Sequence, residues 1–337
     1  MTPPSADRTD SATKRRLRDA ILQLIGFGLG ILFIIWCFRR AFSGDGFVSV
    51  ADHVGAAPTW LIVAALLSTL VSVVANGLIF WCTIQPVRPL RLVDVQAVNL
   101  LASLLNYAPF RIGLVARIAF HWRVDRIGPA LMTAWLITAL LSLCVAFVAV
   151  ALAMPLAPKI GLPGVFLVIT ATCIVATWLV RKAVAIESVR SRLRGAHAML
   201  GEVRSFGLAV ALRVVDIVAF TARMTCVAAI LNSPLTVGQA AMLGLAAFAL
   251  TMNPIGRFGF REAGVAWLAS NVFKGTLSEQ DLGQAFAQLA LVDSAAEAAV
   301  TIPLGALAAL WCWRRTQRGD QARASSVTTS DAEAPSK

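Results

Sequence analysis

The chain turns polar twice inside hydrophobic sequence, first at NYAPFRIGLVAR (residues 106–117) and again at NPIGRFGFRE (residues 253–262). Each break follows an apolar run and combines proline, glycine and arginine. Arg111 and Arg257 each begin an Arg-x-Gly triplet, and they lie 146 positions apart in a chain of 337 residues. Hydrophobic segments interrupted by Gly or Pro at corresponding places in two halves are the best sequence pointer to a transporter binding site. The pairing therefore predicts an internal duplication.

The composition places the chain in a membrane. Hydrophobic residues make up 58% of it and charged residues 14%, and its mean hydropathy is +0.75. These values exclude an ordinary soluble domain. A helix needs roughly 20 apolar residues to cross a bilayer. Six stretches meet or approach that length and are the predicted spans: Ala20–Phe38, Pro58–Val87, Ile127–Pro158, Ile160–Val180, Ser205–Leu231 and Leu282–Trp313.

Two shorter apolar pieces, Leu92–Ala108 and Val237–Met252, each end in one of the breaks. A short helix that stops at Pro and Gly is what a re-entrant hairpin needs, because irregular backbone at membrane depth is tolerated only inside protein or beside a water-filled cavity. We therefore expect an all-α polytopic membrane protein with about six full spans and two re-entrant or short hairpin segments.

The distribution of basic residues predicts the topology. The formal net charge is +12, and basic residues precede the first span, fill the loop 181–204 and follow the last span. Basic residues near spans gather on the cytoplasmic side, which explains the charge without nucleic acid as a partner. Both termini are then cytoplasmic, in a bacterial-type inner membrane. Because each half has three spans, an odd number, the second half is inverted relative to the first. The predicted domains are a disordered basic tail (1–19), two membrane repeats (20–157 and 158–315) and a disordered tail (316–337).

The two breaks also resemble a known family. The pattern Arg111-x-Gly113 with Arg117, and Gly256-x-x-Gly259 followed by Arg261 and Glu262, resembles the flippase-like transmembrane region of lysylphosphatidylglycerol synthases and their stand-alone relatives. The resemblance spans about residues 20–313. It implies an eight-segment bundle that moves an aminoacylated phospholipid or another lipid-linked anion between leaflets, here in a stand-alone member without the soluble aminoacyl-transfer domain.

Some positions depart from the pattern of that family. Leu114 stands where an acidic residue usually follows the first motif glycine, and an acidic-basic pair common in the third span is replaced by Met132-Thr133-Ala134-Trp135. Asp293 occupies a region of the final span where a basic residue is expected. These departures leave the identity of the lipid open.

The breaks hold the candidate substrate site. Guanidinium groups bind phosphate bidentately and keep their charge when desolvated, and glycines let backbone N–H groups approach an oxyanion at a helix N-terminus. A carboxylate there could contact a cationic headgroup. The alternative is that the arginines only anchor the hairpins to carbonyls, interfacial phosphates or acidic neighbours. The predicted substrate-binding residues are Asn106, Arg111, Gly113, Arg117, Asn253, Gly256, Arg257, Gly259, Arg261 and Glu262.

A second set of charges lies inside the predicted spans: Arg213, Asp216, Arg223, Asp293 and Glu297. A charge at bilayer depth costs roughly 2.5–3.5 kcal/mol on insertion scales unless it is paired or hydrated, so these side chains should face the bundle interior. One role is a fixed salt bridge between helices. The other is titration of Asp293 or Glu297 coupled to lipid movement.

Other functions have weaker support. No Walker A sequence, metal-ligand spacing or cofactor motif is present, so we expect no cofactor and no metal. The alternative class is a membrane-embedded lipid-modifying enzyme. A phosphatase has no visible nucleophile in the breaks, and for a transferase His121 with Asp125 is the only candidate acid-base pair. A non-transporting subunit that works with lipid-synthesis enzymes is a third reading. We therefore expect a transporter of membrane lipids rather than an enzyme, with the oligomeric state open.

Overall fold

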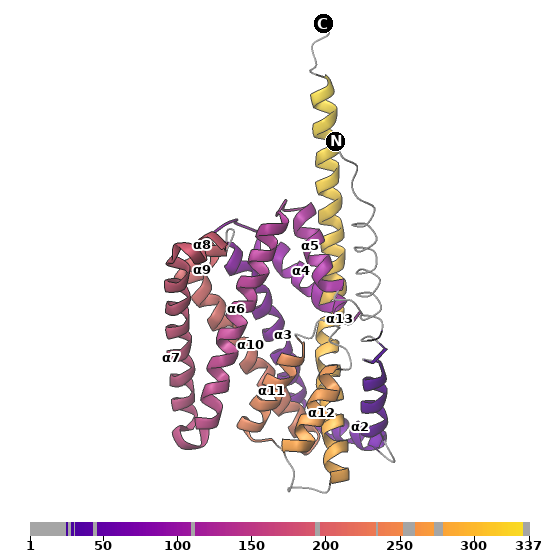
Figure 1. Ribbon diagram of the computed structural model, residues 1–337. Helices are drawn as coiled ribbons and strands as arrows, with labels where there is room; N and C mark the ends of the chain where they lie inside the picture. Colours follow the sequence, from indigo (N-terminus) through magenta and orange to yellow (C-terminus); the bar gives the residue numbers. More distant parts are fainter. Residues whose placement is uncertain are drawn as a thin grey trace, which may run out of the picture.

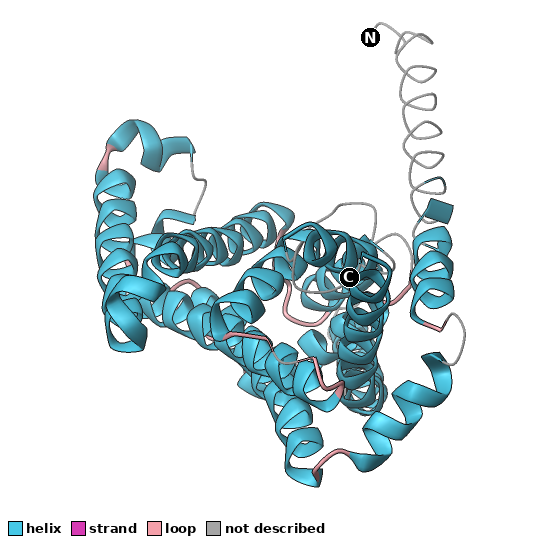
Figure 2. Cartoon of the chain, turned by 90° about the horizontal axis from the view of Figure 1, so that it is seen from below, coloured by secondary structure: helices cyan, strands magenta, loops and turns pink. Residues whose placement is uncertain are grey.

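The computed structural model describes residues 25, 28–29, 31–42, 46–108, 112–192, 196–233, 235–251, 260–272 and 279–332. Within these ranges every regular element is helical (Figure 2). Residues 31–41 form a helix before the first labelled one. The labelled helices are α2 (Gly46–Ala56), α3 (Thr59–Ile84), α4 (Leu92–Leu105), α5 (Ile112–Arg123), α6 (Pro129–Ala153), η2 (Met154–Leu156), α7 (Ala157–Ala185), α8 (Glu187–Arg192), α9 (Ala196–Gly201), α10 (Val203–Ile230), α11 (Val237–Thr251), α12 (Phe260–Val272) and α13 (Glu279–Ala332).

Four stretches of the described chain are long and apolar enough to cross a membrane: Thr59–Ile84, Pro129–Ala185, Val203–Ile230 and Gln284–Arg318. The second contains two helices, α6 and α7, which reverse direction through η2 and lie side by side (Figure 1). The reversal includes Gly161, whose φ of 65° suits glycine because it lacks a Cβ atom. The outward faces are apolar, as Leu167 and Ile174 on α7 illustrate. The protein is therefore a helical integral membrane protein.

Two pairs of short helices follow the long ones. Helices α4 and α11 have 14 and 15 residues, which corresponds to about 21–23 Å of helix and falls short of the roughly 30 Å hydrocarbon core. Helix α4 packs against α5, and α11 packs against α12. The two short apolar pieces of the sequence thus form the first arms of two helical pairs.

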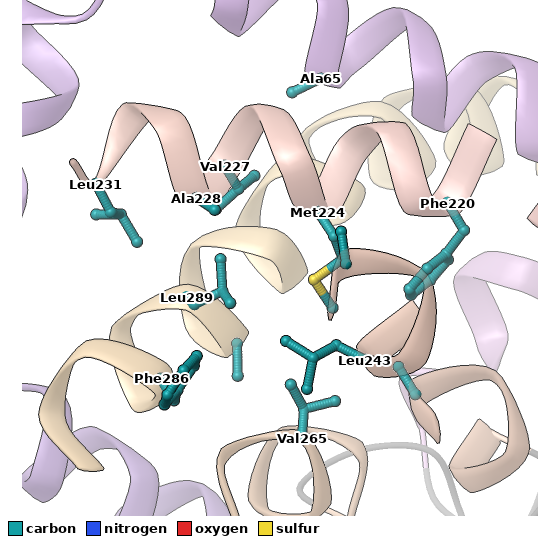
Figure 3. Close-up of a cluster of buried hydrophobic side chains, with 13 residues drawn as sticks. Ala65, Phe220, Met224, Val227, Ala228, Leu231, Leu243, Val265, Phe286 and Leu289 are labelled. Atoms are coloured by element: carbon teal, nitrogen blue, oxygen red, sulfur yellow. The ribbon is translucent and has the colours of Figure 1, made fainter. Parts of the chain in front are cut away.

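The bundle is organised around α3 and α10, which make its most extensive helix contact, while α13 packs against α4, α12 and α3. Near one end of the bundle, a cluster of buried apolar side chains joins α3, α10, α11, α12 and α13 (Figure 3). Phe220 and Met224 of α10 lie next to Leu243 of α11, and Leu289 of α13 completes this core. At the other end, a second cluster gathers around Trp135 of α6, which is fully buried.

The end of the chain differs from the prediction. Residues 316–337 were expected to form a disordered tail, but α13 continues as a helix to Ala332 (Figure 1). Part of this extension has a local reason, because the stretch 321–324 consists of Gln, Ala and Arg, which are good helix formers. The predicted tail 1–19 lies outside the described residues.

Candidate functional site

A cavity of about 450 Å³ lies in the middle of the bundle. It is lined from α3, α4, α5, α6, α10, α11 and α13, so most helices of the bundle contribute a wall. Its volume is in the range of small-molecule sites, roughly 300–1,000 Å³. Five charged side chains line it: Arg117, Arg213, Asp216, Arg223 and Glu297.

Arg117, on α5, is the cation of this cavity with the weakest compensation. Its side chain is buried and lies over the ring of Phe80, with 3.6 Å from the guanidinium carbon to the ring centroid. Its Nη2 donates a hydrogen bond of 2.8 Å to Asn99 Oδ1. Among the described residues no carboxylate lies within ion-pair distance of Arg117, although a guanidinium group carries five N–H donors.

Arg213, on α10, faces the same cavity. Its Nη1 donates to Asp216 Oδ2 at 2.9 Å and to Asn76 Oδ1 at 3.1 Å. The other oxygen of Asp216 accepts a hydrogen bond of 2.5 Å from Ser72 Oγ. Arg213 therefore has one carboxylate partner, and its buried Nε has no acceptor among the described residues.

Two asparagines connect these arginines. Asn76 Nδ2 donates to Asn99 Oδ1 at 3.1 Å, and Asn99 Nδ2 donates to the carbonyl oxygen of Val73 at 3.0 Å. The amides thus hold Arg117 and Arg213 on one polar wall, and the two like charges repel each other. With three arginines and two carboxylates, the described lining carries one excess positive charge.

The third arginine of the cavity belongs to a buried ion-pair network. Arg223 donates through Nε to Asp293 Oδ1 at 2.6 Å and through Nη2 to Glu297 Oε2 at 3.1 Å. Arg261, from α12, donates to the same two carboxylates, with 2.6 Å from its Nη1 to Glu297 Oε2. Both guanidinium groups lie over the ring of Phe220, at 4.5 and 4.9 Å. This quartet joins α10, α12 and α13.

The quartet bears on the two roles that the sequence left open for Asp293 and Glu297. Each carboxylate is bridged by two guanidinium groups, and Asp293 is fully buried. The four ion pairs connect α13 with α10 and α12. The geometry favours a fixed ionic link between helices, and proton coupling stays a prediction.

The residues of the first break are only partly described. Asn106, which ends α4, lines the cavity together with Arg117. Gly113 lies where α5 crosses closest to α4, because a Cβ atom there would sit 2.1 Å from the carbonyl oxygen of Ala102. Arg111 lies outside the described residues.

Of the second break, the structure describes the last three residues, Phe260, Arg261 and Glu262. Arg261 is held by the quartet, and Glu262 accepts a hydrogen bond of 2.6 Å from Ser294 Oγ on α13. Neither side chain lines the cavity. The predicted site residues Asn253, Gly256, Arg257 and Gly259 lie outside the described residues.

The acid-base pair considered for an enzyme is formed, but away from the cavity. His121 Nδ1 lies 2.7 Å from Asp125 Oδ2, and the imidazole packs edge-on against Trp135 at 5.0 Å. His121 is only 1% exposed. The pair is absent from the lining of the described cavity, and His121 lies in the last turn of α5.

The sequence reasoning missed Ser72, Asn76 and Asn99, which orient the charged side chains. Their signal was present, because Asn76 interrupts a 26-residue apolar helix and Asn99 a 14-residue one. Polar side chains at membrane depth are expensive and usually hydrogen-bond across helices.

No family model, curated protein or solved structure matches this chain. The site is therefore interpreted from its own chemistry.

Proposed function

We propose that this protein translocates a lipid with an anionic, phosphate-containing headgroup between the leaflets of a membrane, and that the headgroup binds in the central cavity. One observation carries the proposal. Arg117 and Arg213 are linked by two neutral asparagines, and the one carboxylate nearby, Asp216, pairs with Arg213. Burying two like charges is costly. A phosphate group would accept hydrogen bonds from the guanidinium groups that line the cavity and neutralise the excess charge.

The position of the cavity along the membrane-spanning helices supports transport rather than binding at a surface. Its lining residues lie at 69–80 in α3, at 136–143 in α6 and at 213–223 in α10. These positions are near the middle of helices that run 59–84, 129–153 and 203–230. Transporters bind substrate near the bilayer midplane, where either side can be reached.

The proposed topology has six spans in two inverted repeats. The helix that includes residues 31–41, α3 and α6 would cross in the first repeat, and α7, α10 and α13 in the second. The pairs α4–α5 and α11–α12 would be re-entrant hairpins. Figure 1 supports this arrangement, because the α4–α5 pair lies in the upper part of the bundle and the α11–α12 pair in the lower part.

The orientation and the lipid class follow from the sequence. The basic loop 181–204 and the basic residues that follow Trp313 favour cytoplasmic termini in a bacterial-type inner membrane. The resemblance of the two breaks to the flippase-like region of lysylphosphatidylglycerol synthases supports a phospholipid or lipid-linked phosphate as the substrate. Rocking of one repeat against the other would expose the cavity alternately to the two leaflets.

The test is leaflet exchange in proteoliposomes. Fluorescent phosphatidylglycerol, lysyl-phosphatidylglycerol and a polyprenyl phosphate would be followed separately with wild type, Arg117→Gln and Arg123→Gln. Arg123 is the matched control because it is an exposed arginine on the same helix. We expect exchange of at least one lipid by wild type and by Arg123→Gln, and its loss in Arg117→Gln.

Two other outcomes would assign a different function. Folded wild-type protein that exchanges none of the three lipids would exclude the translocase and move attention to an enzyme or to a subunit of a lipid-synthesis complex. Exchange that survives in Arg117→Gln would show that the cavity does not bind the headgroup.

A further inference from the structure

One wall of the central cavity has the opposite chemistry from the arginine wall. It is formed by leucines of α6 that recur at spacings of three and four residues and so form one stripe on that helix: Leu136, Leu140 and Leu143. Leu114 of α5 also lines the cavity. The cavity therefore has a charged side and a hydrocarbon side.

The leucine wall lies where two helices separate. Helix α5 packs mainly on α4 and α13, whereas α6 packs on α3, α7 and α10. Toward the end of the bundle where α5 ends and α6 begins, Ile118 and His121 of α5 meet Trp135 of α6. The cavity lies between the two helices about one turn after Trp135 on α6 and one turn before Ile118 on α5.

Leu140 borders both the cavity and the outer surface. It lines the cavity, yet 45% of its surface is exposed. Ile137, one turn earlier on α6, is exposed to 48% and does not line the cavity. The cavity thus reaches the side of the bundle at Leu140, at the middle of an apolar helix of 25 residues.

From this geometry we propose a lateral portal between α5 and α6, lined by Leu114, Leu136 and Leu140, that binds the hydrocarbon chain of the substrate. The inference rests on the proposed function. An acyl or prenyl chain would lie against the leucines and extend into the bilayer, while the phosphate binds Arg117 and Arg213. An amphiphile of this kind matches both walls, because apolar surface is stabilised by leaving water and phosphate by charged donors.

The experiment distinguishes binding of the lipid's hydrocarbon chain from binding of its headgroup. Leu140→Trp is compared with Ile137→Trp, which adds the same bulk to the same helix outside the portal. Two measurements are made on each: exchange of fluorescent phosphatidylglycerol in proteoliposomes, and binding of glycerol phosphate, which has no chain, to purified protein. We expect exchange by Leu140→Trp to fall at least about tenfold, because the larger indole ring would occupy the portal. Glycerol phosphate binding should stay within about twofold of wild type because the arginine wall is intact.

Each other result has a definite meaning. Normal exchange by Leu140→Trp, or loss of exchange by both tryptophan variants alike, would overturn the portal. Loss of glycerol phosphate binding in Leu140→Trp would also overturn it, because Leu140 would then belong to the headgroup site. Wild type that neither exchanges lipid nor binds glycerol phosphate would refute the proposed function itself.

A smaller side chain provides a second variant if the tryptophan prevents folding. Leu140→Ala widens the wall, and we expect exchange at least as fast as in wild type. Slower exchange by folded Leu140→Ala would contradict the portal.

Discussion

Arg223 and Asp293 form a two-point ion pair across the bundle, with Nε donating to Oδ1 at 2.6 Å and Nη2 donating to Oδ2 at 3.1 Å. The two residues are 70 positions apart, on α10 and α13, and both are almost completely buried. Arg261 donates to the same carboxylate from α12. Two cations that share two buried anions hold three helices together.

Replacing Asp293 by Ala should strongly destabilise the protein. Removal of one member of a buried ion pair leaves uncompensated charge and costs roughly 3–5 kcal/mol. In Asp293→Ala, Arg223 and Arg261 would share only Glu297. Thermal or denaturant unfolding in detergent would measure the loss. The control is Glu187→Ala, an exposed carboxylate on α8, and equal stability of the two variants would contradict the structural role.

Replacing Arg117, unlike replacing Asp293, should impair lipid exchange without reducing stability. This buried cation has no carboxylate partner among the described residues, so Arg117→Gln removes a desolvation penalty while an amide can still bond Asn99. We expect unchanged or increased thermal stability in detergent, together with loss of lipid exchange. This combination is expected for a residue that is needed for function but lowers the stability of the fold. A clear fall in stability would indicate that Arg117 mainly holds the hairpin.

Gly113 should tolerate no side chain. A Cβ atom there would lie 2.1 Å from Ala102 O and 2.4 Å from Asn106 Oδ1, so Gly113→Ala forces α5 away from α4. Overpacking of this kind costs about 1–3 kcal/mol. The control is Gly207→Ala on α10, where a Cβ atom meets nothing within 4 Å. In a helix that change should stabilise by roughly 0.5–1 kcal/mol. The two variants should therefore shift the unfolding midpoint in opposite directions.

His121 should make stability depend on pH. Burial lowers the pKa of His121, and its hydrogen bond with Asp125 opposes this shift in part. Because the folded state has the lower pKa, the unfolded state takes up the proton first. The contribution of neutral His121 is then complete above about pH 6.5, its unfolded value, and is lost as the pH falls through the folded value.

The measurement is the unfolding midpoint between pH 8 and pH 5. We expect wild type to lose stability toward pH 5 more steeply than His121→Gln, after each is referred to its own value at pH 8. Parallel curves for the two proteins would show that His121 is not held neutral by the fold.

Much of the architecture was accessible from local sequence. Apolar runs predicted the positions of α3, α6, α7, α10 and α13, and the short apolar pieces predicted α4 and α11. This works because a chain in hydrocarbon must satisfy its backbone hydrogen bonds within each segment, so the length of an apolar run predicts a helix. The C-terminal helix was missed because its polar composition carries no such signal.

The candidate site was less accessible. Arg213, Asp216 and Arg223 were expected to face the bundle interior, and the structure places all three on the cavity. Their partners come from distant positions: Ser72 is 144 positions from Asp216, and Asn76 is 137 positions from Arg213. No spacing within the chain encodes which side chains meet across helices.

The sequence by itself determined that the chain is a helical membrane protein, where its long helices lie, and which charged side chains must be kept from lipid, because hydropathy and the cost of burying charge act locally. Only the tertiary structure decided how those charges are shared. In the structure, Arg223 and Arg261 form ion pairs with Asp293 and Glu297, whereas Arg117 donates a hydrogen bond to the neutral side chain of Asn99. The physical reason is that pairing energy falls with distance, so the packing of the helices decides which arginine meets a carboxylate and which meets a neutral amide.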